Sequence, residues 1–236
     1  MPSNITQATV SANLGPLVRV FVPKKRPWSL IIFMFVVGLA TSWLLVGLWM
    51  LWEISRLPNV SRSQAARRLY LYERGFVIAD KPDNPQVYRW DDIGTVFQKI
   101  VSRRSYGIEV ARQHEYTITR KDGQTVKVTQ FWDGIADLGP IINQCVSQAL
   151  MPGVLAAIDR GQGVQFGDLT LSAVGVAGPR KQVTWAEVNK FTIANGHVRM
   201  GVAGKFLSLS TTAVAEIPNL PLFLTLAERL RAAAQR

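Results

Sequence analysis

The feature that most constrains this chain is an apolar run from Trp28 to Trp52, which holds 25 residues and no charged side chain. An α-helix rises about 1.5 Å per residue, so one helix over this run would be about 37 Å long, against a bilayer hydrocarbon core of about 30 Å. Tryptophans stand at both ends of the run, where interfacial aromatic side chains are favoured. The run therefore predicts one transmembrane helix over residues 28–52 and a single-pass protein of the cell membrane.

Two alternatives to a single crossing are disfavoured by the sequence. A secretory signal peptide fits poorly, because the run is too long, begins late and is followed by no small-residue cleavage site. A two-helix hairpin also fits poorly, because each half would have about 12 residues and could not span a bilayer. We therefore predict one continuous helix.

The orientation of that helix depends on the basic residues beside it, and these are equal in number on the two sides. Before the run stand Arg19, Lys24, Lys25 and Arg26, and after it stand Arg56, Arg62, Arg67 and Arg68. The positive-inside rule therefore gives a tie. The N-terminal cluster is closer to the membrane and would hold the N-terminus inside, whereas the basic C-terminal part, with its single thiol, suits the cytoplasm. We predict cytoplasmic C-terminal domains.

Composition limits the remainder of the chain. The net charge is +11, and residues 53–236 alone carry 23 basic and 16 acidic side chains. Such an excess favours anionic partners, for a tethered protein most simply lipid headgroups, and the alternative is a solvated surface. The single Cys145 cannot form an intramolecular disulfide, and its apolar neighbours favour a packed core thiol over a reactive one.

Two parts of the soluble region resemble each other. Residues 69–77 (LYLYERGFV) align with residues 169–177 (LTLSAVGVA), so that Gly75 matches Gly175. Further on, Trp90-Asp-Asp-Ile matches Trp185-Ala-Glu-Val. Within each part the apolar residues alternate with a period of two, which is typical of half-buried strands. An internal repeat of antiparallel strands is therefore predicted.

Turn and helix signals complete both repeats. Asn195-Gly196 between two β-compatible runs is a strong hairpin signal, and Lys121-Asp-Gly123 reads similarly. Apolar residues at spacings of three and four predict a helix over about 134–150, which Pro152 and Gly153 bend or end, and a second helix beginning near Pro218 and Pro221.

Antiparallel strands, a Trp-acidic-hydrophobic element and a closing helix resemble the pleckstrin-homology-like (PH-like) superfold, especially its GRAM-type members. The whole chain is similar to an uncharacterised family of bacterial membrane proteins. This resemblance implies a mainly β, α+β fold with two tandem PH-like domains, and it implies no reaction. The expected organisation is an irregular tail (1–27), a transmembrane helix (28–52), a linker (53–67) and PH-like domains at 68–160 and 161–236. Gly75, Trp90, Gly175 and Trp185 are the structural anchors of the repeat, with both tryptophans in the core.

The sequence offers little for catalysis. His114 and His197 belong to no metal-ligand spacing, and the glycines of residues 161–167 join a helix to a strand, which is the wrong order for a phosphate loop. Acidic pairs such as Asp133 and Asp137 read as helix caps or solvated surface. We therefore predict no enzyme, no metal and no cofactor. Nucleic acid is not expected, because aromatic residues do not interleave with the basic ones in a known binding pattern.

A noncatalytic membrane-anchored binding or scaffolding protein is the function expected, with a protein partner at an open sheet edge or in the groove beside a closing helix. The alternative is a sensor of anionic lipid headgroups. Residues 99–127 carry a net charge of +4 and supply the candidate contacts Lys99, Arg103, Arg104, Arg112, Arg120, Lys121 and Lys127. The turn beside Gly75 offers only one basic residue, Arg74, and no basic residue stands beside Gly175. This scarcity of basic residues disfavours specific inositide recognition. Partner identity and oligomeric state stay open.

Overall fold

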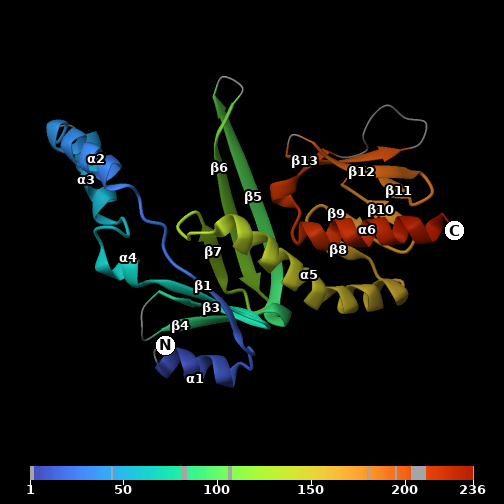
Figure 1. Ribbon diagram of the computed structural model, residues 1–236. Helices are drawn as coiled ribbons and strands as arrows, with labels where there is room; N and C mark the ends of the chain where they lie inside the picture. Colours follow the sequence, from blue (N-terminus) through green and yellow to red (C-terminus); the bar gives the residue numbers. More distant parts are fainter. Residues whose placement is uncertain are drawn as a thin grey trace. The chain divides into compact units, whose positions relative to one another are not determined.

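The computed structural model describes residues 3–43, 45–80, 84–105, 108–179, 181–194, 196–202 and 211–235 (Figure 1). Antiparallel sheets and α-helices make it an α+β protein, which confirms the α+β part of the predicted fold class. The chain forms two compact units. Unit 1 comprises residues 1–89 and 130–134, and unit 2 comprises residues 90–129 and 135–236.

Unit 1 contains a four-stranded antiparallel sheet in the order β1 (Leu17–Phe21), β2 (Arg68–Tyr72), β3 (Gly75–Ala79) and β4 (Pro85–Arg89). The short helix α4 (Arg62–Ala66), capped by Ser61, leads into β2. The expected irregular tail over residues 1–27 is wrong, because this segment forms helix α1 (Ser3–Ser11) and the edge strand β1. Ile5 and Leu14 are fully buried against Val77 and its neighbours, so tertiary burial orders a segment whose own periodicity is weak.

The apolar run is two helices, not one. Helix α2 (Trp28–Ala40) and helix α3 (Leu45–Ser55) pack side by side as a hairpin (Figure 1). The prediction of one continuous helix over 28–52 is therefore wrong. Thr41 ends α2, and its hydroxyl donates to the carbonyl of Val37 at 2.7 Å, an interaction by which Thr competes with the helical ladder.

Glycine permits the return of the chain at this turn. A Cβ on Gly47 would lie 2.2 Å from the carbonyl oxygen of Thr41, and one on Gly38 would lie 3.2 Å from Leu51. Ile31, Ile54 and Leu57 fill the interior of the hairpin. The predicted linker 53–67 thus begins with the last turn of α3 and ends with α4.

Unit 2 begins with a short 3₁₀ turn (Trp90–Asp92) and a three-stranded sheet of β5 (Ile93–Ser105), β6 (Ile108–Arg120) and β7 (Thr125–Thr129). The predicted turn at Lys121–Gly123 joins β6 to β7, with Gly123 at a positive φ of 89°. Strand β7 pairs only with residues 115–119 of β6. The far parts of β5 and β6 therefore continue past β7 as a two-stranded ribbon.

The second part of unit 2 holds two small antiparallel sheets. One is β8 (Val164–Phe166), β9 (Leu169–Leu171), β10 (Gly175–Ala177) and β11 (Gln182–Thr184); the other is β12 (Val188–Ala194), β13 (His197–Val202) and β14 (Thr211–Ala213). The hairpin predicted at Gly196 connects β12 to β13. After a 3₁₀ turn (Val214–Glu216), α6 (Leu220–Ala234) begins with a proline in its first turn, as predicted. Trp185, Phe166 and Phe223 anchor the shared core.

Helix α5 (Ile135–Asp159) does not end at Pro152 and Gly153 but continues past them to Asp159. An interior proline costs about 3 kcal/mol, but the part of α5 beyond Pro152 packs Val154 and Leu155 against the core of β8–α6. Among the described residues, α5 is the one helix long and apolar enough to cross a membrane. One stripe of this helix, which includes Leu138, Ile142 and Val146, is buried, as in an amphipathic helix that packs on a core.

The two repeat glycines occupy corresponding positions in their sheets. Gly75 pairs with Arg89 and Gly175 pairs with Thr184, in each case the residue before the repeat tryptophan. A Cβ on Gly75 would lie 2.2 Å from the carbonyl oxygen of Tyr88, and a Cβ on Gly175 would lie 2.0 Å from that of Val183. Trp90 and Trp185 are both buried, and the indole of Trp185 donates to the carbonyl of Ser172 at 2.8 Å. Each glycine is required by close backbone approach.

Candidate membrane anchor and binding clefts

The α2–α3 hairpin presents apolar side chains outward. Phe33 is 63% exposed, Leu39 59% and Val46 65%, although an apolar side chain gains free energy from burial. Helices that are apolar on every side suit a hydrocarbon environment. At about 1.5 Å per residue, α2 is about 20 Å long and α3 about 16 Å, so the hairpin has the length of one leaflet and some of the next.

Several hydrogen-bond donors at the tip of the hairpin have internal partners. The Thr41 hydroxyl and backbone amide both donate to the carbonyl of Val37, and the amide of Ser42 donates to Leu39 at 3.2 Å. Non-helical backbone enters a bilayer only when its polar groups are satisfied. Three donors of the turn, the amides of Thr41 and Ser42 and the Thr41 hydroxyl, meet this requirement.

The base of the hairpin is tied together and basic. The backbone amide of Arg26 donates to the side-chain oxygen of Asn59 at 2.8 Å, and the Asn59 amide nitrogen donates to the Arg26 carbonyl at 3.0 Å. The Arg56 guanidinium lies 3.7 Å from the centroid of the Trp52 ring. A cleft of about 420 Å³ opens here within unit 1, and its lining includes Lys24, Lys25, Arg26, Arg56 and Glu53.

The predicted lipid contacts of residues 99–127 are spread along the β5–β7 sheet. Among them, Lys127 forms an ion pair with Glu115 at 3.4 Å, and Arg120 forms one with Asp122 at 2.8 Å. Lys99 stands opposite Glu115 in the strand register of β5 and β6, and Lys121 stands in the turn before β7. The backbone pairing sets Arg103 opposite Ala111, Arg104 opposite Glu109 and Arg112 opposite Ser102, while the side chains of these three arginines lie outside the described residues. Acidic neighbours therefore reduce the positive charge of this sheet at several points.

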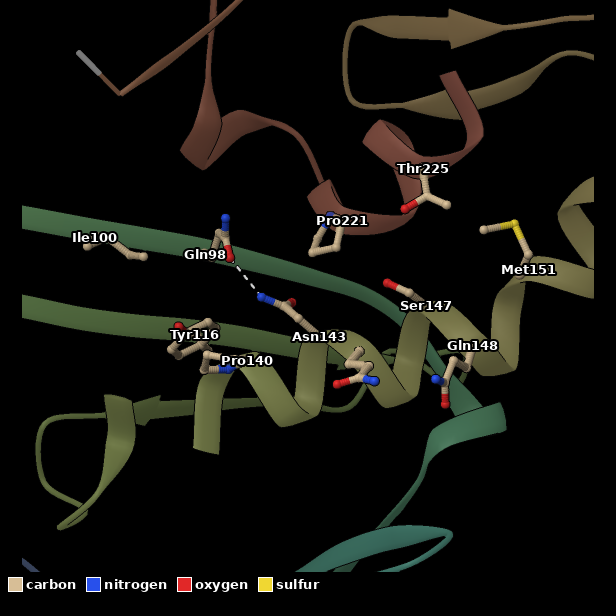
Figure 2. A pocket seen from close by; sticks show the side chains of 11 residues that line it. Gln98, Ile100, Tyr116, Pro140, Asn143, Ser147, Gln148, Met151, Pro221 and Thr225 are labelled. Carbon is tan, nitrogen blue, oxygen red and sulfur yellow. Dashed lines mark hydrogen bonds between the residues drawn. The ribbon is translucent and has the colours of Figure 1, made fainter. Parts of the chain in front are cut away.

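A second cleft, of about 500 Å³, lies within unit 2 between the face of β5 and β6, helix α5 and the start of α6 (Figure 2). Its floor is Tyr116, which is 2% exposed and whose pKa is raised by burial. Asn143 donates its side-chain amide to the Gln98 side-chain oxygen at 2.7 Å. The full lining is Gln98, Ile100, Tyr116, Pro140, Asn143, Gln144, Ser147, Gln148, Met151, Pro221 and Thr225, with no charged residue.

The position of α5 against the sheet creates this cleft. Gly139 lets the helix approach β6 so closely that a Cβ there would lie 2.1 Å from the Tyr116 ring. Asn143 and Ser147, four residues apart, then fall on one helix face, and Gln148 lines the cleft next to Ser147. Sequence reasoning missed these residues, because neutral amides and hydroxyls on an amphipathic helix carry no motif. The general expectation of a groove beside a closing helix was the only signal.

Within the described part of the chain, no group of three or more His, Cys, Asp or Glu residues is placed to hold a metal ion. The Nδ1 atom of His114 is buried without a hydrogen-bond partner, and the other histidine, His197, lies on β13. Cys145 is half-buried on α5, and burial raises the pKa of its thiol, which disfavours the reactive thiolate at neutral pH.

The fold and these surfaces define an α+β protein with an apolar helical hairpin, a basic cleft at the base of the hairpin and an uncharged cleft in unit 2. The chain belongs to the family of unknown function DUF6585, whose model matches residues 1–236. This agrees with the resemblance to an uncharacterised family, whose bacterial origin stays a prediction. No curated protein and no solved structure matches the chain.

Proposed function

We propose that this protein is a noncatalytic binding protein held at the cell membrane by the α2–α3 hairpin. The observation that carries the proposal is the hairpin itself, with large apolar side chains exposed on its outer surface and three donors of its turn bonded within the hairpin. The start of α2 and the end of α3 both stand at the base of the hairpin. The chain therefore enters and leaves the membrane on the same side. The equal basic clusters before and after the run then lie on one face, which removes the tie in the positive-inside count.

The cytoplasmic face is the proposed location of both ends. Eight basic residues flank the hairpin, and basic residues are retained on the cytoplasmic side of short membrane segments. Arg67 is engaged within unit 1, where it forms an ion pair with Asp80 at 2.6 Å and lies over the ring of Phe131. Lys24, Lys25 and Arg56 are in no ion pair among the described residues, and they provide the charge nearest the membrane.

We propose further that the two repeats are PH-like domains. A four-stranded sheet, a three-stranded sheet and a helix follow one another in the order β1–β4, β5–β7, α5, and again as β8–β11, β12–β14, α6. Six or seven antiparallel strands closed by one helix are what the resemblance predicts. Strand β1, from the segment before the hairpin, supplies the first strand of the first repeat, so the proposed first domain begins before the anchor.

The uncharged cleft of unit 2 is the proposed binding site. Its apolar floor favours burial of an apolar group, while the side-chain amides of Gln98, Asn143 and Gln148 offer both donors and acceptors. The absence of charge from its lining opposes a charged ligand, because desolvating an ion without a partner is costly. A short, neutral, extended segment of a protein partner matches this chemistry. Headgroup binding through Lys99–Lys127 is the alternative, and it is weakened by the ion pairs of Lys127 and Arg120.

Paired charge insertions test the anchor. Phe33→Asp with Val46→Asp places two carboxylates on the outer surface of the hairpin, and a charge within the bilayer costs about 2.5–3.5 kcal/mol on insertion scales. The variant is expected to leave the membrane fraction after carbonate extraction. The matched control is Val174→Asp with Ile193→Asp, at residues 64% and 52% exposed in unit 2, which is expected to stay bound. Retention of the hairpin variant, or equal release of both, would contradict the anchor.

Site-specific photocrosslinking in intact membranes tests the cleft. A photoreactive residue at Gln148 is expected to capture one discrete partner, whereas the same residue at exposed Lys190 is expected to capture none. Ser147→Trp, which fills the cleft, is expected to reduce capture at least about tenfold, since this corresponds to about 1.4 kcal/mol. Capture that Ser147→Trp leaves unchanged would argue against binding in this cleft.

A further inference from the structure

A second site lies at the base of the hairpin, apart from the binding cleft of unit 2. The cleft of about 420 Å³ there is bounded by Pro27, which directly precedes α2, and by Leu57 and Pro58, which follow α3. If the hairpin is the anchor, this level of the molecule coincides with the headgroup layer, which lies just outside the hydrocarbon core. The volume is in the range of sites that enclose a small ligand.

The charge of this cleft favours an anion. Four of its ten lining residues are basic (Lys24, Lys25, Arg26 and Arg56) and one is acidic (Glu53). None of these four forms an ion pair among the described residues. A neighbouring cleft of about 640 Å³ shares Lys24 and Lys25 and adds Arg68 and Asp133. The two lysines thus stand between two openings that are both net basic.

Hydrogen bonds hold the backbone at Lys24 and at Arg26. The cationic side chains therefore extend from a fixed backbone. The amide of Lys24 donates to the carbonyl of Phe131 at 2.7 Å, and the Arg26 backbone is bonded twice to Asn59. Pro27 gives α2 no side-chain cap, and the positive end of the α2 dipole adds to the field of the lysines. Trp52, under the guanidinium of Arg56, provides an interfacial aromatic beside the site.

We infer that this cleft binds the phosphate of an anionic lipid headgroup through Lys24, Lys25 and Arg56. The inference rests on the proposed anchor for the lipid as the source of the phosphate. It goes beyond that anchor, because an apolar hairpin needs no particular headgroup. Lysine ammonium groups and an arginine fork are the usual phosphate ligands of proteins.

The test uses the full chain in a non-ionic detergent, with soluble dihexanoyl phosphatidic acid, dihexanoyl phosphatidylcholine and inorganic phosphate as three separate ligands in calorimetric titrations. Phosphatidic acid is expected to bind at one site and more tightly than either other ligand. Lys24→Gln with Lys25→Gln is expected to weaken that binding about 30-fold, from the usual contribution of two cations near an anionic headgroup. Lys24→Arg with Lys25→Arg is expected to retain it.

The matched control is Lys181→Gln with Lys190→Gln, which removes the same charge from exposed positions in unit 2. An equal loss in this control, or phosphatidylcholine binding as tightly as phosphatidic acid, would overturn the site. Inorganic phosphate binding as tightly as the lipid would overturn the lipid assignment and make free phosphate the ligand. Because the titrations need no bilayer, loss of the anchor appears separately, as release of the wild-type chain by carbonate.

Discussion

At the scale of single residues, Asn219 has the most demanding environment. It is 7% exposed, with a φ of 51°, and its side-chain oxygen accepts from the amide of Val96 at 2.9 Å while its nitrogen donates to the carbonyl of Gly94 at 2.9 Å. Its own amide donates to the carbonyl of Val96 at 2.8 Å. One asparagine thereby extends the pairing of β5 and fixes the first residue of α6.

Asn219→Ala is therefore expected to lower the free energy of unfolding by about 3 kcal/mol. The substitution leaves the Val96 amide and the Gly94 carbonyl without their side-chain partner. It also places alanine at a positive φ, where it has no polar side chain to compensate the strain. Asn219→Gly removes the same two bonds but tolerates the φ, so its loss is expected to be about 1 kcal/mol smaller. Urea denaturation measures both, with exposed Asn189→Ala as the control. A loss below about 1 kcal/mol for Asn219→Ala would show that Asn219 does not tie β5 to α6.

At the scale of elements, the sequence predicts what local pattern controls. The hairpins at Gly123 and Gly196 and the start of α6 at Pro221 follow from turn and helix signals, and they are present. Two of the elements that differ from expectation depend on distant partners. Helix α1 is ordered by the sheet that Ile5 covers, and α5 continues past Pro152 because a second core receives it.

The break between α2 and α3 also differs from the prediction. It shows that the length of an apolar run does not decide between one long helix and two shorter ones. A run of 25 apolar residues is long enough to cross, and nothing in hydropathy separates it from two shorter helices. The signals that separate them are small: Thr41 and Ser42 together in the middle, with Gly38 and Gly47 on either side. These glycines permit close contact between helices, which a composition average does not register.

The candidate sites were predictable to different degrees. The basic character near the membrane was visible in the sequence, but the expectation centred on Lys99–Lys127, whereas the residues that line a basic cleft are Lys24, Lys25 and Arg56. Arg56 follows the two lysines by more than 30 residues in the sequence. Only the closure of the hairpin brings Arg56 and the lysines to one cleft. The unit 2 cleft carries no charge and no motif.

At the scale of the whole molecule, the proposed hairpin anchor implies a different membrane topology from a single crossing. A single crossing would separate the first 27 residues from the rest, whereas the structure pairs β1 from that segment with β2 from beyond the run. Leu17 through Phe21 cannot pair with residues 69–72 across a bilayer, because strand pairing requires a spacing of about 5 Å. The sheet of unit 1 and the proposed anchor therefore require both ends of the chain on one side.

The most direct test of this account is the accessibility of two single cysteines in intact cells. In a Cys145→Ala background, Ser11→Cys on α1 and Ala233→Cys near the end of α6 each give one exposed thiol. If the hairpin holds both ends of the chain in the cytoplasm, a membrane-impermeant maleimide labels neither cysteine in intact cells and labels both after lysis. Labelling of one cysteine and protection of the other in intact cells would show that the chain crosses the bilayer, and would contradict the hairpin anchor.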